Sequence, residues 1–137
     1  IKLKTEGAFH TSLMIKAAEE FKQCLGQTEF KQMKAPVLSN FSSEIHKIDG
    51  SKSSELLYNQ LFKPVNWLGC MDTASKMEVE IIIEFGGGIG EGTPPNEKRP
   101  NLEGITKKNF RNLKSEVIYV PAINTSTIEE ASKLNYQ

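Results

Sequence analysis

One segment of this 137-residue chain constrains the fold more than any other, because it has the composition of a strand covered on both faces. The segment from Val79 to Phe85 is β-branched and nearly all apolar, as expected for a parallel strand between layers of helices. A second apolar run, Val117 to Val120, follows after a stretch with helical character. Strands separated by helices predict an α/β architecture with a parallel sheet.

The spacing of apolar residues and the positions of capping and turn residues predict the other helices, strands and loops. Apolar residues recur at three- and four-residue steps over 12–25, and Cys24 is part of this stripe, so we expect an amphipathic helix with a buried Cys24. Further helices are expected over 53–61, 66–77, 105–112 and 127–134, and further strands within 1–9 and over 35–41. The expected N-caps are Ser12, Ser53 or Ser54, and Thr125 or Ser126. Residues 42–52, which include His46 in a solvated position, and 86–104 are expected to be loops.

Composition excludes several functional classes. Seventeen basic and seventeen acidic residues give no net charge, so nothing indicates an electrostatic nucleic-acid binder. No apolar run approaches the roughly 20 residues of a membrane span. Cys24 and Cys70 have no Cys or His partner at zinc-site spacing, so we expect no metal site and a reducing compartment. The chain begins at Ile1 within an apparent strand, which suggests a fragment or a processed product.

The glycine-rich run after the 79–85 strand invites comparison with a nucleotide-binding loop. Its glycines, from Gly86 to Gly92, do not fit the G-x-G-x-x-G spacing, and Thr93-Pro94-Pro95 prevents the helix that would hold a phosphate. A tight turn with close backbone approach explains the glycines better.

His10 lies between an expected strand and the N-terminus of the 12–25 helix, a junction where chemistry gathers in α/β proteins. From the residues alone, a structural and a catalytic role for His10 both stay open. Trp67, the only tryptophan, is expected to pack behind the sheet, and Asn40 either caps a turn or reaches the site.

Several motifs, taken together, resemble one family. Gly7-Ala8-Phe9-His10-Thr11-Ser12-Leu13-Met14 resembles the catalytic-histidine segment of malonyl-CoA:acyl-carrier-protein transacylases and related acyltransferase domains. Three further matches follow in the family's order: Pro36-Val37-Leu38-Ser39-Asn40, Gln60-Leu61-Phe62-Lys63-Pro64-Val65-Asn66-Trp67, and Ile83-Glu84-Phe85-Gly86-Gly87-Gly88. Gly87 stands where the family usually has proline, and the resemblance fades beyond residue 90.

The resemblance implies an incomplete domain. The fold would be the hydrolase-like large subdomain of an acyltransferase, with 1–90 as the family-like core, 91–104 as a loop insertion and 105–137 as the C-terminal strand and helix. The family's nucleophilic serine lies on a G-H-S-x-G motif, which this chain lacks. The chain is therefore expected to be the C-terminal part of an acyltransferase, inactive alone.

The resemblance also implies site residues and partners. His10 would be the general base, the backbone carbonyl of Gln60 would orient it, and Phe9 would contact the substrate. The expected reaction moves a malonyl group from malonyl-CoA to the phosphopantetheine thiol of acyl carrier protein through a seryl acyl-enzyme, by ping-pong kinetics in fatty acid biosynthesis. No permanently bound cofactor, nucleic acid or membrane is expected, and the compartment is expected to be cytoplasmic or organellar of plastid type. The basic residues that could steer an acidic carrier are Lys63, Lys107, Lys108 and Arg111.

Two other hypotheses stay open. A non-catalytic α/β interaction module could keep a family-like surface without a nucleophile. A hydrolase of the same Ser–His type would pass the acyl group to water instead of a thiol.

Overall fold

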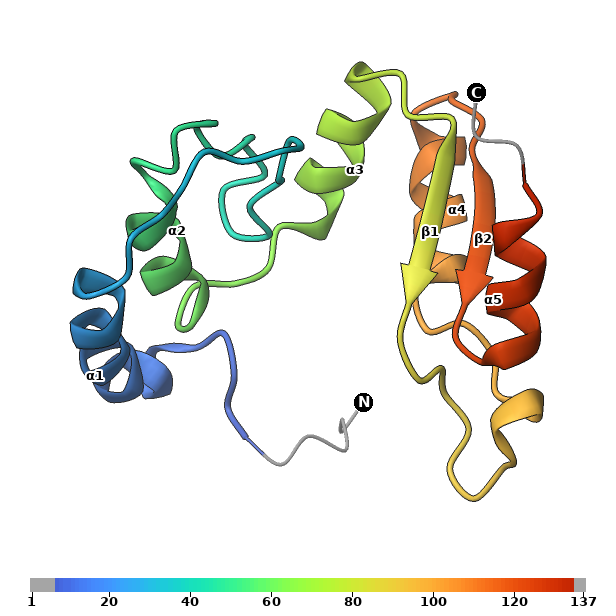
Figure 1. Ribbon diagram of the computed structural model, residues 1–137, viewed down its shortest axis with the longest axis horizontal. Coiled ribbons are helices and arrows are strands. Elements are labelled where there is room, and N and C mark those ends of the chain that lie inside the picture. The colour runs from blue at the N-terminus through green and yellow to red at the C-terminus, as the bar shows by residue number, and fades with distance from the viewer. Residues whose placement is uncertain (1–6, 135–137) are drawn as a thin grey trace. The chain divides into compact units, whose positions relative to one another are not determined.

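The computed structural model describes residues 7–134, which form two compact units that divide between Thr73 and Ala74 (Figure 1). The strand expected within 1–9 falls mostly on residues 1–6, outside the described part of the chain, and residues 9–11 form a turn and a bend. No helix among residues 7–134 is long and apolar enough to cross a membrane.

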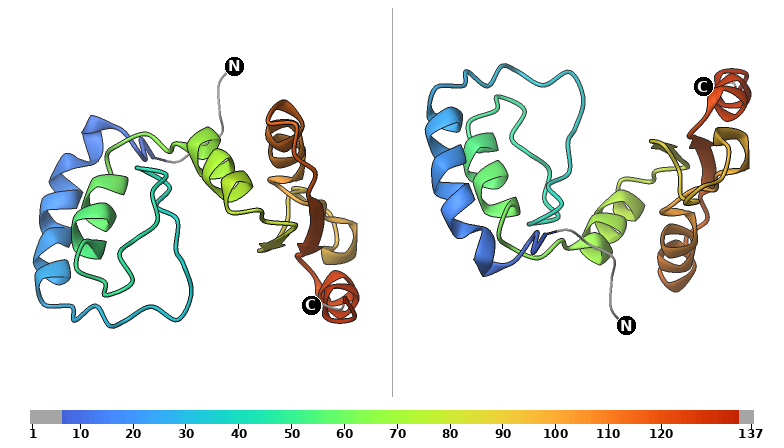
Figure 2. Two further views of the ribbon diagram at one scale, coloured as in Figure 1. Left: turned by 90° about the horizontal axis from the view of Figure 1, so that it is seen from above. Right: turned by 90° about the horizontal axis from the view of Figure 1, so that it is seen from below.

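Helices dominate the first unit, and α1 and α2 lie side by side in it (Figures 1 and 2). A 3₁₀ turn, η1 (Ser12–Met14), leads into α1 (Ile15–Gly26), and α2 spans Ser53–Gln60. The helix α3 (Trp67–Lys76) begins in this unit and contains the division between the two units. These elements confirm the helices predicted over 12–25, 53–61 and 66–77.

The start and the buried face of α1 differ from the prediction. Thr11, not Ser12, is the N-cap of the first turn, and its hydroxyl accepts a hydrogen bond from the amide of Leu13. Cys24 is exposed, so the prediction that it is buried was wrong. The reason is that the buried face of α1 is narrow: Ala18 and Leu25 are the only buried residues of this helix.

The segment 35–41 is not a strand. Its β-type pairing is limited to one isolated antiparallel bridge between Leu38 and Ile45. Two backbone hydrogen bonds flank this bridge, from the Ser39 amide to the Glu44 carbonyl and from the His46 amide to the Val37 carbonyl. The apolar composition therefore marks a tight hairpin-like loop, which is too short for a strand.

His46 is buried, so the prediction that it is solvated was wrong. Its Nδ1 atom lies 3.1 Å from the hydroxyl of Ser53, the first residue of α2. Neither Ser53 nor Ser54 is the N-cap, because that position is held by Lys52, which makes no side-chain capping bond. The Ser53 side chain instead fixes the 42–52 loop under the start of α2.

The second unit is a βαβα arrangement. Its elements are β1 (Ile81–Phe85), α4 (Glu103–Asn112), β2 (Ile118–Ala122) and α5 (Thr125–Ser132). The strands pair in parallel, with Ile83 opposite Val120, which confirms the predicted parallel sheet. Figure 2 shows α4 and α5 on opposite faces of these strands. On the α5 face, a small core forms from Val120, Ala122 and Ala131, with Ile81 and Ile83 packed against it.

The cap of α5 was predicted one or two residues too late. Asn124 is the N-cap: its side chain accepts a hydrogen bond from the Thr127 amide, and the Thr127 hydroxyl accepts one from the Asn124 amide. This reciprocal capping box satisfies two amides that a helix start would otherwise leave unpaired.

The predicted 86–104 loop is irregular over most of its length, but it contains a short 3₁₀ turn, η2 (Pro95–Glu97), and its last two residues already belong to the helix α4, which begins at Glu103. An antiparallel bridge joins Ile89 to Arg99 and closes the loop on itself. Gly88 has a φ of 65°, and a Cβ atom there would lie 2.9 Å from the side chain of Ile123. This close approach agrees with the interpretation of the glycine run as a tight turn.

Candidate active site

His10 lies in the short turn that precedes η1, and its side chain is exposed. Its backbone has a φ of 60°, in the left-handed region that most residues avoid. Non-glycine residues held in this conformation cost of order 1 kcal/mol each and concentrate at functional sites. The hydroxyl of Thr11 helps to hold the turn, because it donates to the carbonyl of Ala8 at 2.7 Å.

Two consecutive carbonyls at the end of α2 hold His10. The Nδ1 atom of the imidazole lies 2.7 Å from the carbonyl oxygen of Gln60. The backbone amide of His10 donates to the carbonyl of Leu61 at 3.1 Å. The last carbonyls of a helix have no partner within the helix, so they are available for such contacts. The structure thus brings His10 and Gln60 together across fifty positions of sequence.

This contact selects one form of the imidazole ring. A carbonyl oxygen can only accept, so the hydrogen-bonded Nδ1 carries the proton in the neutral ring. The other nitrogen, Nε2, is then an unprotonated acceptor on an exposed side chain. A ring fixed in one tautomer with a free Nε2 is able to take a proton from a nucleophile.

Phe9 stands beside His10 and is 61% exposed, an unusual state for so large an apolar side chain. Its ring folds back over Gly7, where a Cβ atom would lie 2.8 Å from the ring. Glycine at position 7 therefore makes room for this ring position. The substrate contact of Phe9 stays a prediction.

Asn40 and Trp67 also belong to the first unit. The Asn40 carbonyl accepts a hydrogen bond from the Asn66 amide at 2.7 Å, which fixes the chain just before α3. The Asn40 Oδ1 and Trp67 Nε1 atoms are buried, and neither has a hydrogen-bond partner among the described residues. The structure does not decide between the two roles considered for Asn40, and the packing of Trp67 behind the sheet stays a prediction.

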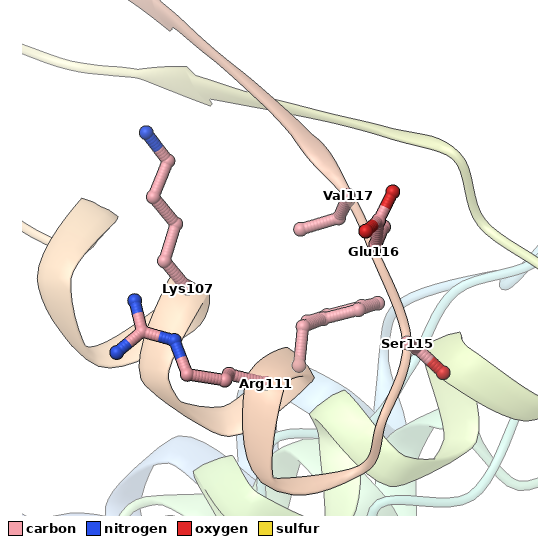
Figure 3. A pocket seen from close by; sticks show the side chains of 6 residues that line it. Lys107, Arg111, Ser115, Glu116 and Val117 are labelled. Carbon is pink, nitrogen blue, oxygen red and sulfur yellow. The ribbon is translucent and has the colours of Figure 1, made fainter.

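Two basic residues of α4, Lys107 and Arg111, border an open hollow in the second unit (Figure 3). Lys107 and Arg111 project from the helix, and Glu116 lies on the segment opposite them. Lys107 is also paired with Glu103 at 2.6 Å. Because the hollow combines both signs of charge, its geometry does not single out an acidic partner.

Glu84, near the end of β1, accepts several hydrogen bonds through its carboxylate, a role that was not predicted from the sequence. Its carboxylate accepts hydrogen bonds from the Asn101 amide at 2.8 Å, the Leu102 amide at 3.0 Å and the Tyr119 hydroxyl. Burial opposes ionisation of Glu84, but these donors outweigh it and hold the pKa of the carboxyl below its usual value. Burial, together with the bond to Glu84, raises the pKa of Tyr119, which keeps the phenol protonated as a donor.

Glu84→Gln is expected to destabilise the start of α4 by about 1–2 kcal/mol at pH 7, because hydrogen bonds to a charged acceptor are among the stronger ones. A carboxyl whose pKa is lower in the folded state stabilises the fold above its unfolded pKa of about 4.3. That contribution is lost as pH falls through the lower folded-state pKa, so the difference between variant and parent should shrink in acid. The difference in local stability is measured by hydrogen exchange at the Asn101 and Leu102 amides, which donate to Glu84.

The matched control for this prediction is Glu80→Gln, which removes an exposed carboxylate from the residue just before β1. Exposed substitutions of this kind change stability by about 0.5 kcal/mol or less. Equal exchange rates in the Glu84 and Glu80 variants at pH 7 would contradict the anchoring role of Glu84.

Other side chains offer no evident ligand set. Within residues 7–134, no three His, Cys, Asp or Glu side chains gather closely enough to hold a metal ion.

A bond from the Tyr58 hydroxyl to Glu19, which joins α2 to α1, was also not predicted from the sequence. No sequence signal links residues 39 positions apart on two different helices, so this contact needed the structure.

Comparison with curated proteins shows clear relatives. The malonyl CoA-acyl carrier protein transacylase of Bacillus subtilis is 31% identical over 121 residues, which cover 88% of this chain and 34% of the relative. The mitochondrial malonyl CoA-acyl carrier protein transacylase of Schizosaccharomyces pombe is 30% identical over 125 residues, covering 82% of this chain and 36% of the relative. No family model matches the chain.

Solved structures show the same fold. The acyl-carrier-protein S-malonyltransferase of Burkholderia pseudomallei aligns with 98% of this chain and 38% of its own, with a TM-score of 0.73 and 23% identity. A malonyl-transacylase solved in complex with a type II polyketide acyl-carrier protein aligns with 94% of this chain and 37% of its own, with a TM-score of 0.73 and 22% identity. The chain thus spans about a third of the length of the proteins it matches. By sequence and by fold, it belongs to the family of the malonyl CoA-acyl carrier protein transacylases.

Proposed function

We propose that this chain supplies the general base of a malonyl-CoA:acyl-carrier-protein transacylase, and that His10 is this base. The observation that carries the proposal is the contact of His10 Nδ1 with the Gln60 carbonyl at 2.7 Å. This bond leaves Nε2 free to accept a proton, which is the property that a serine nucleophile requires of its partner. The nucleophile would be a serine from the part of the enzyme that this stretch does not contain.

In the first half-reaction, Nε2 of His10 takes the serine hydroxyl proton while the serine oxygen bonds to the thioester carbon of malonyl-CoA. The C–S bond then breaks, and the proton passes from His10 to the departing CoA thiolate. The products are free CoA and a malonyl ester on the serine. Throughout, the Gln60 carbonyl accepts a hydrogen bond from Nδ1–H and keeps the ring in one orientation.

In the second half-reaction, His10 takes the proton of an incoming thiol, and the thiolate attacks the malonyl ester. The serine oxygen leaves and recovers the proton from His10, which restores the enzyme. We assign the thiol to the phosphopantetheine arm of an acyl carrier protein. One similar structure is itself a malonyl-transacylase bound to an acyl-carrier protein, which supports this choice of partner.

The test is a transfer assay with radiolabelled malonyl-CoA and phosphopantetheinylated acyl carrier protein, using the protein as the cell makes it. The expected result is label on the carrier, with initial rates that show ping-pong dependence on the two substrates. Release of free malonate without labelled carrier would overturn the proposal in favour of a hydrolase. Neither product, in a folded protein, would favour the non-catalytic interaction module.

A further inference from the structure

One polar contact joins α1 to α2 close to the candidate base. The Tyr58 hydroxyl on α2 donates to Oε1 of Glu19 on α1. Tyr58 stands two residues before Gln60, roughly 3 Å along the helix axis. Glu19 stands four residues after Ile15, the first residue of α1, roughly 6 Å along its axis. The bond therefore connects the two helix ends that flank His10.

Two of the three buried residues of α1 and α2 lie away from His10. Ala18 is fully buried and lets the helices approach closely, but its methyl group provides little apolar area. The other buried residue of α1 is Leu25, near the opposite end of the helix from His10. The buried residue of α2 is Ser53, at the end distant from Gln60. At the end near His10, the Tyr58–Glu19 bond is a polar link between the two helices.

Two further side chains, Lys22 and Phe62, contact the ring of Tyr58. The ammonium of Lys22, on the next turn of α1, lies 5.3 Å from the ring centroid. Phe62, just beyond the end of α2, meets the ring edge-on at a centroid distance of 5.2 Å. The phenol is protonated at neutral pH and is therefore a donor, and the hydrogen bond to Glu19 raises the pKa of Tyr58 further. Tyr58 thus ties α1 to the segment whose carbonyls hold His10.

We propose that Tyr58 and Glu19 are positioning residues: the bond between them fixes the end of α2 against α1 and thereby keeps the Gln60 carbonyl on the His10 imidazole. The kinetic consequence rests on the proposed function, whereas the structural consequence does not. This difference allows the two to be tested separately.

The structural test is the tautomer of His10, read by ¹⁵N NMR of the imidazole at a pH where the ring is neutral. The parent protein is expected to show the Nδ1–H form, because the Gln60 carbonyl accepts a hydrogen bond from that group. In Tyr58→Phe, which keeps the ring but loses the hydroxyl, the Nε2–H form should gain population. The signals of His10 are assigned by their absence from His10→Asn, which separates them from those of His46.

The kinetic test is malonyl transfer by the same variants. Tyr58→Phe is expected to lower kcat about tenfold, because a base displaced by a fraction of an ångström loses much of its effectiveness. The KM for malonyl-CoA should stay within about twofold, since uniform binding is not affected. Glu19→Ala should do the same, and the double variant should be no worse than either single one, as expected for one shared interaction.

Two control variants complete the experiment. Glu19→Gln keeps an acceptor oxygen and should recover most of the activity and the Nδ1–H form. Glu20→Gln removes the neighbouring exposed carboxylate of α1 and should change neither readout. An unchanged tautomer and kcat in Tyr58→Phe, beside an inactive His10→Asn, would overturn the positioning role alone. An active His10→Asn would overturn the proposed function, and the tautomer would still decide the positioning role.

Discussion

His10→Ala is expected to lower the turnover of malonyl transfer by a factor on the order of 10⁶, because the members of a Ser–His unit act together. Without the imidazole, no group in the His10 turn can take the proton of the attacking hydroxyl. Alanine is disfavoured at a φ of 60°, so His10→Asn is the sharper variant. Asparagine tolerates this backbone conformation and cannot act as a base. Single-turnover transfer of label from malonyl-CoA measures both variants.

His46 provides a matched control, because it is the other histidine of the chain. His46→Asn breaks the buried contact with Ser53, so a loss of stability of about 1–2 kcal/mol is expected with turnover changed little. Gln60→Ala should also be mild, since the backbone oxygen, and not the side chain, meets His10. Turnover above a tenth of the parent value in His10→Asn, about a 1.4 kcal/mol change in barrier, would exclude His10 as the base.

The elements of the fold were predictable where a local pattern decides them. The β-branched run of β1 and the shorter run of β2 predicted parallel strands between helices, and helices lie on both of their faces. The predicted cover of β1 on both faces is incomplete, because its residues are half-buried or, at Phe85, exposed. Helical periodicity located α1 through its apolar stripe, and Pro64 set the limit of α2. In these segments the nearest neighbours in sequence are enough to select the backbone conformation.

Burial in loops could not be predicted in this way. His46 lies in a polar stretch, yet the packing of that stretch against the first turn of α2 covers its side chain. Cys24 has the spacing of a buried residue, yet it is exposed because the buried face of α1 contains only Ala18 and Leu25. Both errors come from tertiary contacts, which periodicity does not encode.

The candidate site shows the same division. The turn before α1 could be located from the sequence, but the contact of His10 with Gln60 was implied only by the family resemblance. The Tyr58–Glu19 bond had no signal of either kind, since it depends on how two helices are rotated against each other. The catalytic roles themselves stay predictions that kinetics must test.

The second large effect is expected from a change in the backbone at the end of α2. Replacing Leu61 with its α-hydroxy acid turns the Gln60–Leu61 amide into an ester, whose carbonyl is a weaker acceptor. Every side chain stays in place, so the change weakens the His10 Nδ1 contact with little other disturbance. The ester also removes the Leu61 amide, whose bond to the Tyr58 carbonyl is long, at 3.4 Å. A weaker contact lets the imidazole move from its position, so turnover should fall by up to about 10²-fold, the cost of a small misplacement of a catalytic group.

Leu61→Pro extends the same argument, because proline disfavours helical dihedral angles in the residue before it and would turn the Gln60 carbonyl away from His10. Loss of the required tautomer costs up to about 10⁴ in turnover in related machinery, so this variant should approach that value. An ester at Asn59 weakens the carbonyl of Tyr58, two residues before Gln60, and is the control that should change turnover little. If the esters at Leu61 and Asn59 act equally, the helix end as a whole matters and the Gln60 carbonyl has no special role. A selective effect at Leu61, beside a mild Gln60→Ala, would show that a main-chain oxygen orients the base.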